Sequence, residues 1–216
     1  MYCPAAFAES DVTVLHEFIR VHPLGALVTL TANGLDASHI PLLVSPEPAP
    51  YGTLRGHVAR ANPIWRDQLD AARCLVIFQG PNSYISPTWY PSKAESGKVV
   101  PTWNYVAVHA HGFVKVHDDP RWTTTHLAEL TATQEAGRSP RWHITDAPAD
   151  YVETMARGVV GIEIRIEQLV GKWKMSQNRS AADRAGVVDS LAREGTAASE
   201  ATSEIMRSIE NRKPAS

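Results

Sequence analysis

The sequence predicts a mainly β protein of the α+β class, built as an antiparallel β-barrel with helices around it. Three observations support this prediction: a hairpin signal at Asn33-Gly34, runs in which apolar and polar residues alternate, and helical segments between the predicted strands. Few of the strands look like members of a parallel βαβ array. With 216 residues, of which 44% are apolar and 20% charged, the chain is long enough to bury a sizeable core.

Composition and charge exclude several classes of protein. The formal net charge of -2 gives no overall attraction to nucleic acid or to a membrane surface. Cys3 and Cys74 have no paired spacing, which argues against a disulfide framework and a cysteine-based zinc site, and favours a cytoplasmic location. No apolar run approaches membrane-spanning length, and the N-terminal region is acidic where a signal peptide would be basic and then apolar. We therefore expect no membrane association.

The first 52 residues predict a helix followed by a hairpin. Ser10 is a suitable cap for a helix with apolar positions at Val12, Leu15, Phe18 and Ile19, ended by Pro23 and Gly25. A strand then covers Ala26 to Leu30, the turn lies at Asn33-Gly34, and a return strand covers Leu35 to Val44, with Pro41 near an edge or bulge. The proline-rich segment 45–52 is expected to be a loop.

The stretch 54–65 is the first candidate binding segment. It predicts a strand through Val58, a basic loop, and a helix that begins at Asn62-Pro63 and places Trp65 and Leu69 on its inner face. Glycine lets a ligand approach the backbone closely, and a helix start presents unpaired N–H groups, so the segment suits a phosphate. An ordinary strand-to-helix turn with a solvated arginine is the alternative.

The middle of the chain predicts two strands separated by a long loop. Cys74 to Phe78 is a continuous apolar run of strand length, and residues 81–98 contain three prolines and are expected to be mostly loop. From Val106 to His117, small apolar side chains alternate with aromatic, histidine and lysine side chains. This pattern is typical of a long, half-buried strand.

The last hundred residues predict helices around one further strand. Asp119-Pro120 caps a helix to about Gly137, and Pro148 opens another that ends at Gly158. The alternation of Ile162, Ile164 and Ile166 with charged residues predicts a strand. Ser180 and Asp183 form a possible capping box, and 181–212 is expected to be helical with a break near Gly195.

Two further clusters could bind a ligand. Thr102, Trp103 and Asn104 offer a hydroxyl, an indole and an amide, which suits a planar heteroaromatic ligand, although a core tryptophan under a loop is the alternative. The segment 172–179 carries three cations, a hydroxyl and two amides, and could instead be a solvated basic hairpin or a helix-capping turn. A nucleic-acid site is disfavoured there because the run is short and Glu163 and Glu167 are close.

Other kinds of site find little support. His109 and His111 share a strand face, but no carboxylate or cysteine follows at ligand spacing, so we expect no metal site. The nucleotide-binding patterns G-x-G-x-x-G and G-x-x-x-x-G-K-[ST] are absent. Local sequence indicates no Ser-His-Asp or Cys-His set, so no catalytic residue is assigned.

Several stretches together resemble the PaiB-type FMN-binding proteins, which are described as negative transcriptional regulators of protease synthesis and sporulation. The resemblance covers nearly the whole chain in the family's order, and lies in Gly-His-Val-Ala-Arg-Ala-Asn-Pro-Ile-Trp at 56–65, Ile-Ser-Pro-Thr-Trp-Tyr at 85–90, Val-Pro-Thr-Trp-Asn-Tyr at 100–105 with Val-His at 108–109, Lys-Met-Ser-Gln-Asn-Arg at 174–179 and Asp-Arg-Ala-Gly-Val at 183–187. The combination is specific, whereas each piece alone is not.

The resemblance implies an antiparallel split β-barrel, related to pyridoxamine-phosphate oxidase and flavin reductases. It implies a homodimer with FMN bound at the subunit interface. On this basis residues 1–175 would form the FMN-binding split-barrel domain with inserted helices, and residues 176–216 a C-terminal helical extension packed on the barrel.

The resemblance also implies which residues contact FMN. The phosphate and ribityl chain would lie by Gly56, His57, Arg60 and Asn62. The isoalloxazine ring or its approach would be contacted by Ser86, Trp89, Thr102, Trp103 and Asn104. The pocket would be closed, from the same or the other subunit, by Lys174, Ser176, Gln177, Asn178 and Arg179.

Three functions remain open at this point. The first is an FMN-binding split-barrel protein that resembles PaiB-type regulators, although no helix-turn-helix and no strongly basic face supports DNA as a partner. The second is a flavin-dependent oxidoreductase that uses FMN on an unknown small molecule. The third is a relative that binds haem or no cofactor.

Overall fold

The computed structural model describes residues 1–66 and 70–212. The chain divides into two compact units. Unit 1 consists of Met1–Asp11, Gln79–Val108 and Val170–Ser216, and unit 2 of Val12–Phe78 and His109–Leu169. The long strands β6 (Arg73–Ile85), β7 (Thr102–His117) and β8 (Val159–Lys174) contribute residues to both units. Residues that are distant in sequence therefore meet within each unit.

Unit 2 contains most of the sheet. Its further strands are β2 (Leu24–Thr31), β3 (Gly34–Pro41), β4 (Leu43–Ser45) and β5 (Thr53–Ala59), and the strand order is β3-β2-β6-β7-β8-β5-β4. The pairs β2–β3, β2–β6, β4–β5 and β5–β8 are antiparallel. Fully buried Leu27, Leu54, Val76, Ile162 and Ile164 come from four of these strands and fill the core.

One end of this strand order, β3, approaches β5, the strand next to the other end, at Gly56. Pro41 is the last residue of β3, and Leu42 follows it. A Cβ at Gly56 would lie 2.8 Å from Leu42 Cδ2 and 3.0 Å from the Pro41 carbonyl oxygen. Only glycine permits so close an approach of one strand to another. The sheet of unit 2 thus curls into a barrel-like structure.

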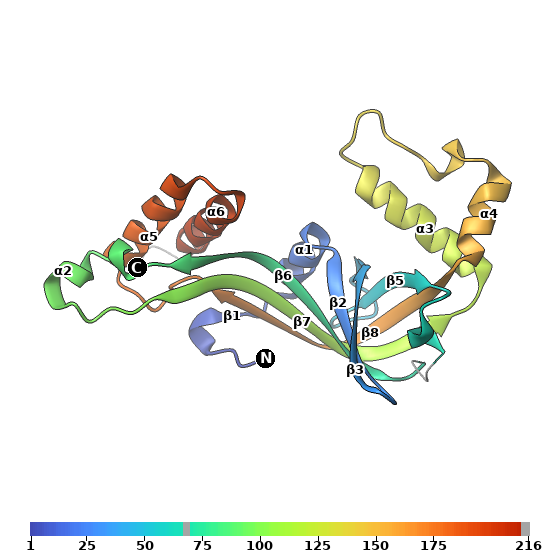
Figure 1. Cartoon of the computed structure of the whole chain (residues 1–216), viewed down its shortest axis with the longest axis horizontal. Helices are drawn as coiled ribbons and strands as arrows, with labels where there is room; N and C mark the ends of the chain where they lie inside the picture. Colours follow the sequence, from blue (N-terminus) through green and yellow to red (C-terminus); the bar gives the residue numbers. More distant parts are fainter. Residues whose placement is uncertain (67–69, 213–216) are drawn as a thin grey trace. The chain divides into compact units, whose positions relative to one another are not determined.

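The helices of unit 2 lie around this sheet. They are α1 (Val12–Val21), α3 (Pro120–Glu135) and α4 (Ala149–Arg157), with the short 3-10 helices η2 (Pro63–Trp65) and η4 (Ile144–Asp146). Helices α3 and α4 form a pair inserted between β7 and β8 (Figure 1). Asp119 caps α3 by accepting a hydrogen bond from the backbone N–H of Arg121.

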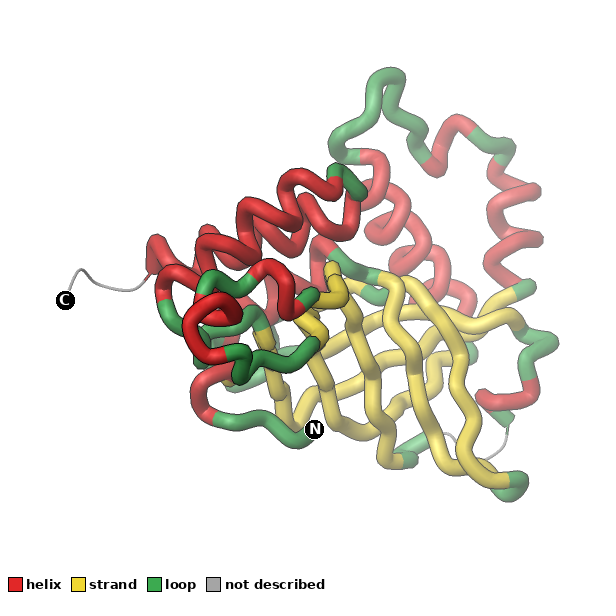
Figure 2. Tube along the Cα trace, turned by 60° about the vertical axis from the view of Figure 1, so that its left-hand side comes forward, coloured by secondary structure: helices red, strands yellow, loops and turns green. Residues whose placement is uncertain are grey.

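Unit 1 combines the ends of the long strands with the C-terminal helices. Strand β1 (Ala8–Glu9) pairs with β8, and the helical segments are η1 (Ala5–Phe7), η3 (Pro87–Trp89), α2 (Ser92–Ser96), α5 (Ala181–Glu194) and α6 (Ala197–Arg212). Helices α5 and α6 lie side by side (Figures 1 and 2). The Ser203 hydroxyl of α6 donates to the Val188 carbonyl oxygen of α5, and the Thr202 and Ser83 hydroxyls are 3.0 Å apart, which ties α6 to β6.

Most predicted elements are confirmed. The helix at 12–21, the hairpin with Gly34 at φ +107°, the long strand through 106–117 and the Asp119 cap are all present. The C-terminal helices break at Gly195, whose φ is +64°. The fold class is therefore the predicted one, mainly antiparallel β with peripheral helices.

Three local predictions are wrong. The helix expected from Asn62 is the 3-10 helix η2, which ends at Trp65, and Leu69 lies outside the described residues. The return strand breaks at Leu42 into β3 and β4. The loop expected at 81–98 instead contains the end of β6, the 3-10 helix η3 and α2. For the basic segment, where alternatives were open, strand β8 continues to Lys174, so Lys172 and Lys174 lie on a strand and the turn begins after Lys174.

Among residues 1–66 and 70–212, no helix has both the length and the apolar character required to cross a bilayer.

Candidate functional site

The second and third predicted clusters meet in unit 1. Lys174, at the end of β8, donates hydrogen bonds through Nζ to the Thr102 hydroxyl at 2.5 Å and to the Trp103 carbonyl oxygen at 2.7 Å. The Ser176 hydroxyl donates to Asn104 Oδ1 at 3.0 Å. Residues separated by about 70 positions thus form one site, which we call the 102–179 cluster and define as Thr102, Trp103, Asn104 and residues 174–179.

The turn that follows Lys174 is held rigidly. Ser176 has φ +62°, which is costly for a residue with a Cβ. The side chain of Gln177 accepts a hydrogen bond from the Met175 backbone N–H at 2.7 Å and donates to the Trp173 carbonyl oxygen at 2.5 Å. Asn104 is fully buried, and its Nδ2 donates to Met206 Sδ at 3.5 Å. Strained but well-supported backbone of this kind is common at binding sites.

Three cations gather around the 102–179 cluster, and the nearest carboxylate, that of Asp183, interacts electrostatically with Arg179 without forming an ion pair with it. In the described part of the chain, Lys172, Lys174 and Arg179 form no ion pair. Lys172 is 7% exposed and lies 5.2 Å from the Tyr105 ring, and the Arg179 guanidinium lies 4.9 Å from the Tyr90 ring. Burial, and then the charges of Lys172 and Arg179, lower the pKa of Lys174. An anion would relieve this repulsion, so the cluster suits an anionic ligand.

An exposed aromatic pair adjoins these cations. Trp103 is 50% exposed and Tyr84 is 48% exposed, and their ring centroids lie 5.9 Å apart in an edge-to-face arrangement. Trp103 Nε1 donates to Asn82 Oδ1 at 3.0 Å, which fixes the indole. Such a pair offers a platform for a planar ligand. Asn82 and Tyr84 were not predicted to contact a ligand, whereas Lys172 belongs to the predicted basic segment 172–179 and, two residues from Lys174 on a strand, shares its face.

Three other predicted contact residues of unit 1 show different environments. The Ser86 hydroxyl caps η3 by accepting from the Thr88 backbone N–H at 3.2 Å. Trp89 follows in η3, and its carbonyl oxygen would lie 2.3 Å from a Cβ at Gly186. Asn178 is exposed. In the described residues, no hydrogen bond links Ser86 or Trp89 to the 102–179 cluster.

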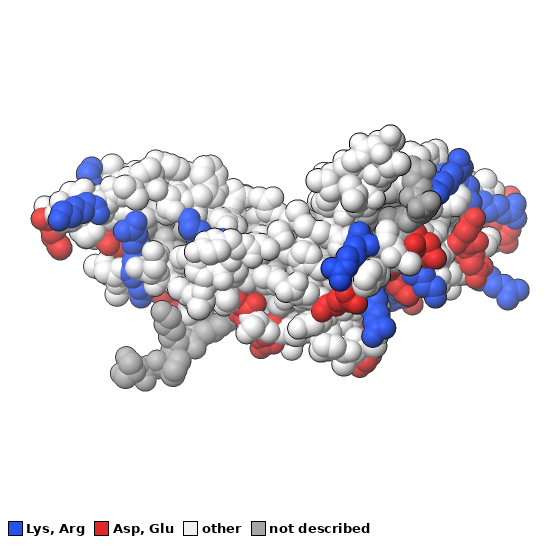
Figure 3. All heavy atoms as spheres, turned by 90° about the horizontal axis from the view of Figure 1, so that it is seen from below, with Lys and Arg blue, Asp and Glu red and all other residues white. Residues whose placement is uncertain are grey.

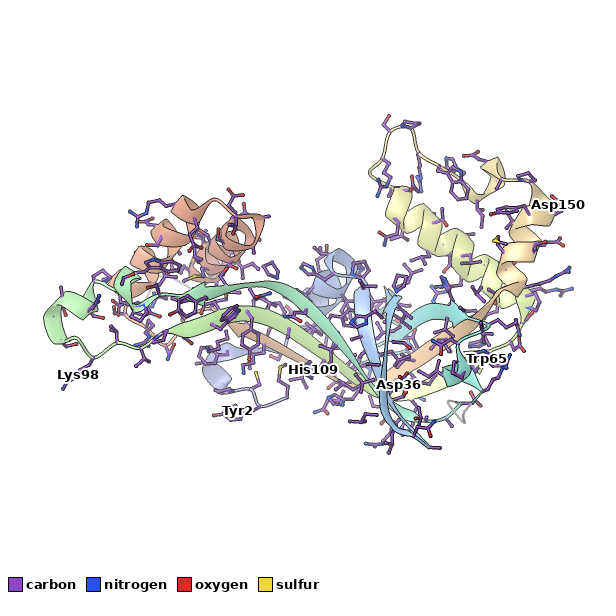
Figure 4. The ribbon with its side chains drawn as sticks, viewed as in Figure 1. Tyr2, Asp36, Trp65, Lys98, His109 and Asp150 are labelled. Carbon is purple, nitrogen blue, oxygen red and sulfur yellow. The ribbon has the colours of Figure 1, made fainter. Side chains whose placement is uncertain are left out.

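The first predicted segment lies in unit 2. Arg60 donates through Nε to the Arg157 carbonyl oxygen at 2.6 Å and through Nη2 to Asp118 at 2.6 Å. The ion pair with Asp118 already compensates the charge of Arg60. The backbone carbonyl oxygen of Arg60 accepts a hydrogen bond from Trp65 Nε1, and Trp65 follows β5 (Figure 4).

The other predicted contact residues of this segment, Gly56, His57 and Asn62, also have partners within the protein. The space beside Gly56 is filled by Leu42 and the Pro41 carbonyl oxygen, so it is not open to a ligand. Asn62 caps η2 through the Ile64 backbone N–H, and its Nδ2 donates to the Ser38 hydroxyl at 3.4 Å. His57 Nδ1 lies 3.3 Å from His126 Nε2. A helix of three residues offers only a short set of N–H groups, which weakens the predicted phosphate cradle.

Two histidines of β7 lie close together. His109 and His111 lie on one face with ring centroids 6.4 Å apart, and burial lowers the pKa of both. Within the described ranges, no group of three or more histidine, cysteine, aspartate or glutamate residues is arranged to hold a metal ion. Cys3 and Cys74 are both free thiols.

Comparison with known proteins identifies the family. A family model described as "Putative FMN-binding domain" matches residues 1–168. The chain belongs to this family. The match includes residues of both units, and it is confirmed by relatives along nearly the full length of the chain.

Two relatives and one solved structure illustrate the similarity. An uncharacterized protein of Emericella nidulans is 35% identical over 242 residues, which cover 96% of both chains. The Bacillus subtilis protein named Protease synthase and sporulation protein PAI 2 is 30% identical over 206 residues, 95% of this chain and 96% of that one. The flavocytochrome Anf3 from Azotobacter vinelandii has a similar structure, with a TM-score of 0.59, 12% identity, and coverage of 83% of this chain and 75% of that chain.

These comparisons confirm the predicted family and fold. The chain is a homologue of PAI 2 with an FMN-binding domain on a split β-barrel. FMN is therefore the cofactor that the residues of the 102–179 cluster have to fit. An unpaired set of cations beside an exposed aromatic pair fits a ligand that is both planar and anionic.

Proposed function

We propose that this protein holds FMN as a redox-active group, with the negative charge of the flavin facing Lys174 and Arg179. The observation that supports this proposal is the gathering of Lys172, Lys174 and Arg179, none of which forms an ion pair among the described residues, with Lys174 bonded to the carbonyl oxygen of the exposed Trp103. FMN, when bound, supplies electron-transfer chemistry, and the protein supplies position and electrostatics.

Each part of the 102–179 cluster has a separate task in this proposal. Trp103 and Tyr84 provide the surface on which the ring system lies. Lys174 and Arg179 stabilise negative charge on the ring or the phosphate. The buried bond from Ser176 to Asn104 and the two bonds of Gln177 hold the turn in place, so that little ordering is needed when the cofactor binds.

The segment 56–62 is retained as a second set of FMN contacts, as the family resemblance implies. Arg60 would have to exchange its Asp118 partner for the phosphate. In the same proposal, residues 1–175 form the FMN-binding domain and residues 176–216 its C-terminal helical extension. The two contact sets belong to separate units, so each is tested by its own variant.

Asp118→Asn provides the test for Arg60. If Arg60 binds the phosphate, removing the competing carboxylate should raise the affinity for FMN several-fold, a modest change because the Arg60–Asp118 pair is partly exposed. The affinity for riboflavin, which lacks the phosphate, should stay the same. Fluorescence titration with both flavins measures this, and an unchanged FMN affinity would count against Arg60 as a phosphate contact.

A homodimer is also part of the proposal. Leu30 and Leu35, on the β2–β3 hairpin, are 73% and 79% exposed, and they border a hollow of about 370 Å³. That hollow is further lined by apolar Val28 and Leu75. Exposed apolar side chains of this kind mark interaction surfaces, and a second copy of the chain is the partner that the family resemblance implies.

Replacing Leu30 and Leu35 together by aspartate is expected to convert the dimer to a monomer, because two charges would have to be buried at the interface. Light scattering coupled to size-exclusion chromatography measures the molecular mass. Tyr151→Asp with Met155→Asp, a matched change of two exposed side chains on α4, serves as the control. A dimer that persists in the leucine variant would rule out the hairpin as the interface.

The redox proposal has one rival. The family resemblance implies a regulator that carries FMN, with DNA as a further partner. Against DNA binding, lysine and arginine side chains are interspersed with carboxylates on the face shown in Figure 3.

The two functions give different experimental results. Oxidation of NADH or NADPH by the FMN-loaded protein, above the rate of free FMN, would support an oxidoreductase. Absence of such turnover, together with sequence-specific retention of DNA at physiological salt, would favour the regulator. The two free cysteines are typical of a reducing compartment, so we propose a cytoplasmic location for either function.

A further inference from the structure

The segment 183–187 belongs to the stretches that carry the family resemblance, yet it supplies none of the proposed FMN contacts. It lies in the first half of α5, after the turn that carries Arg179. Asp183, Arg184 and Gly186 each contact a different part of unit 1. Together these contacts fix the surroundings of Arg179.

Arg184 joins the turn to the last helix. Its Nη1 donates to the Arg179 carbonyl oxygen at 2.7 Å, and its Nε donates to Glu210 Oε1 of α6, also at 2.7 Å. The Arg184 side chain is 19% exposed, so solvent competes little for these bonds. A planar guanidinium that makes two short hydrogen bonds has a well-defined orientation. Arg184 therefore ties the backbone of Arg179 to α6.

The backbone of Arg179 is held on both sides. Its N–H donates to the Ser176 carbonyl oxygen at 2.9 Å, and its carbonyl oxygen accepts from Arg184. The hydroxyl of Ser176 is in turn bonded to the buried Asn104. From this fixed backbone, the Arg179 guanidinium lies 4.9 Å from the centroid of the Tyr90 ring.

The position of the Tyr90 ring depends on a second contact of the segment. Tyr90 is 1% exposed and directly follows η3. Helix α5 approaches η3 so closely that a Cβ at Gly186 would lie 2.3 Å from the Trp89 carbonyl oxygen. Glycine at this position permits the close approach. The ring beside the Arg179 guanidinium is thus held by the same helix that supplies Arg184.

Asp183 attracts Arg179 but is bonded elsewhere. Its carboxylate accepts from the Ser92 backbone N–H at 3.1 Å and from the Ser92 hydroxyl at 2.9 Å. Its charge interacts with that of Arg179, but no ion pair joins the two among the described residues. The guanidinium of Arg179 therefore stays available to an anionic ligand.

We propose that Arg184, anchored on Glu210, is a positioning residue for the flavin site, which fixes Arg179 so that its guanidinium faces the anionic part of FMN. Arg184 itself touches no part of the cofactor. This inference rests on the proposed function, because it takes Arg179 as an FMN contact. It also gives α6 a part in cofactor binding, although the family model ends at residue 168.

Flavin fluorescence titration of the full chain with FMN, in wild type, Arg179→Ala, Arg184→Ala and the double variant, tests this proposal. Each single variant should bind FMN about tenfold more weakly, because both lose the charge-assisted hydrogen bond of Arg179. In the Arg179→Ala background, Arg184→Ala should cause no further loss, because it acts only through Arg179. A variant that merely disturbs the fold would lower the affinity in both backgrounds.

Glu210→Ala separates positioning from simple charge. Removal of a carboxylate would, by charge alone, strengthen the binding of an anion. We expect the opposite, a several-fold weaker binding of FMN, because Arg184 loses its anchor; the change is modest because the Arg184–Glu210 pair is partly exposed. Glu204→Ala removes another exposed carboxylate of α6, which forms no ion pair in the described part of the chain, and should leave the affinity unchanged.

Three results would overturn this inference and leave the proposed function standing. The first is a wild-type affinity in Arg184→Ala when Arg179→Ala is weakened. The second is an equal loss from Arg184→Ala in both backgrounds, and the third is an affinity in Glu210→Ala at or above that of the wild type. If instead Arg179→Ala itself binds FMN like the wild type, the proposed contact of Arg179 with FMN is wrong, and this inference is wrong with it.

Discussion

Replacing Lys174 and Arg179 together by alanine is expected to weaken FMN binding by about 100-fold, since each side chain can provide a charge-assisted hydrogen bond worth roughly 1.5 kcal/mol or more. The charges of Lys172 and Arg179 disfavour the charged form of Lys174, so an anionic ligand gains from both side chains. Equilibrium titration of the apoprotein, followed by flavin fluorescence, measures the dissociation constant.

The control for this variant removes two charges elsewhere. Lys98→Ala with Arg207→Ala changes the net charge by the same amount at two exposed positions of unit 1, and its FMN affinity should equal that of the wild type. Equal loss of affinity in both double variants would mean that only net charge matters. An unchanged affinity in the Lys174 and Arg179 variant would place FMN elsewhere.

The free energy of unfolding is expected to fall by about 3 kcal/mol between pH 6.5 and pH 4 because of His126 alone. Burial, and then the charges of His57 and Arg55, lower the pKa of His126 to about 4. In the unfolded chain the same ring takes up a proton near pH 6.5. The unfolded state therefore binds one more proton between these values, and the stability from this group is complete above pH 6.5 and decreases by about 1.4 kcal/mol per pH unit below it.

Urea unfolding at a series of pH values, in wild type and in His126→Gln, measures this effect as a difference between two curves. Other groups that titrate in this range, including His57, contribute to both curves. The difference should change with pH by about 3 kcal/mol. His39→Gln, at an exposed position on β3, serves as the matched control. Parallel curves for wild type and His126→Gln would show that His126 titrates normally in the folded protein.

Local sequence signals predicted the elements whose cause is local. The Asn33-Gly34 turn, the Asp119 cap and the break at Gly195 depend on residues within one turn of one another, and all three are present. The alternation from Val106 to His117 predicted a strand because one face of β7 is buried.

The errors occur where distant contacts determine the structure. Pro81 suggested a loop, yet β6 continues through it to Ile85. Asn62 caps as predicted, but the helix it opens lasts only three residues. A good cap shows where a helix can begin and carries no information about its length.

In the candidate site, too, the contacts between residues distant in sequence could not be predicted from local patterns. The meeting of Lys174 with Thr102, and of Ser176 with Asn104, joins residues about 70 positions apart, and only the family resemblance connected them in the sequence. The stack of His117, Trp122 and His126 was not predicted at all, because no spacing rule links α3 to the strands against which it packs. The pairing of Arg60 with Asp118 was not predicted either, because no local pattern links these two positions.

The central claim is that the 102–179 cluster binds the anionic flavin cofactor FMN. The most direct test is an absorption spectrum of the protein after soaking in excess FMN and removal of free ligand, made in parallel on wild type and on the Lys174 and Arg179 double variant. The account predicts a flavin spectrum at one FMN per chain for the wild type and little or none for the variant. A wild-type protein that stays colourless, or a variant that retains as much flavin as the wild type, would contradict it.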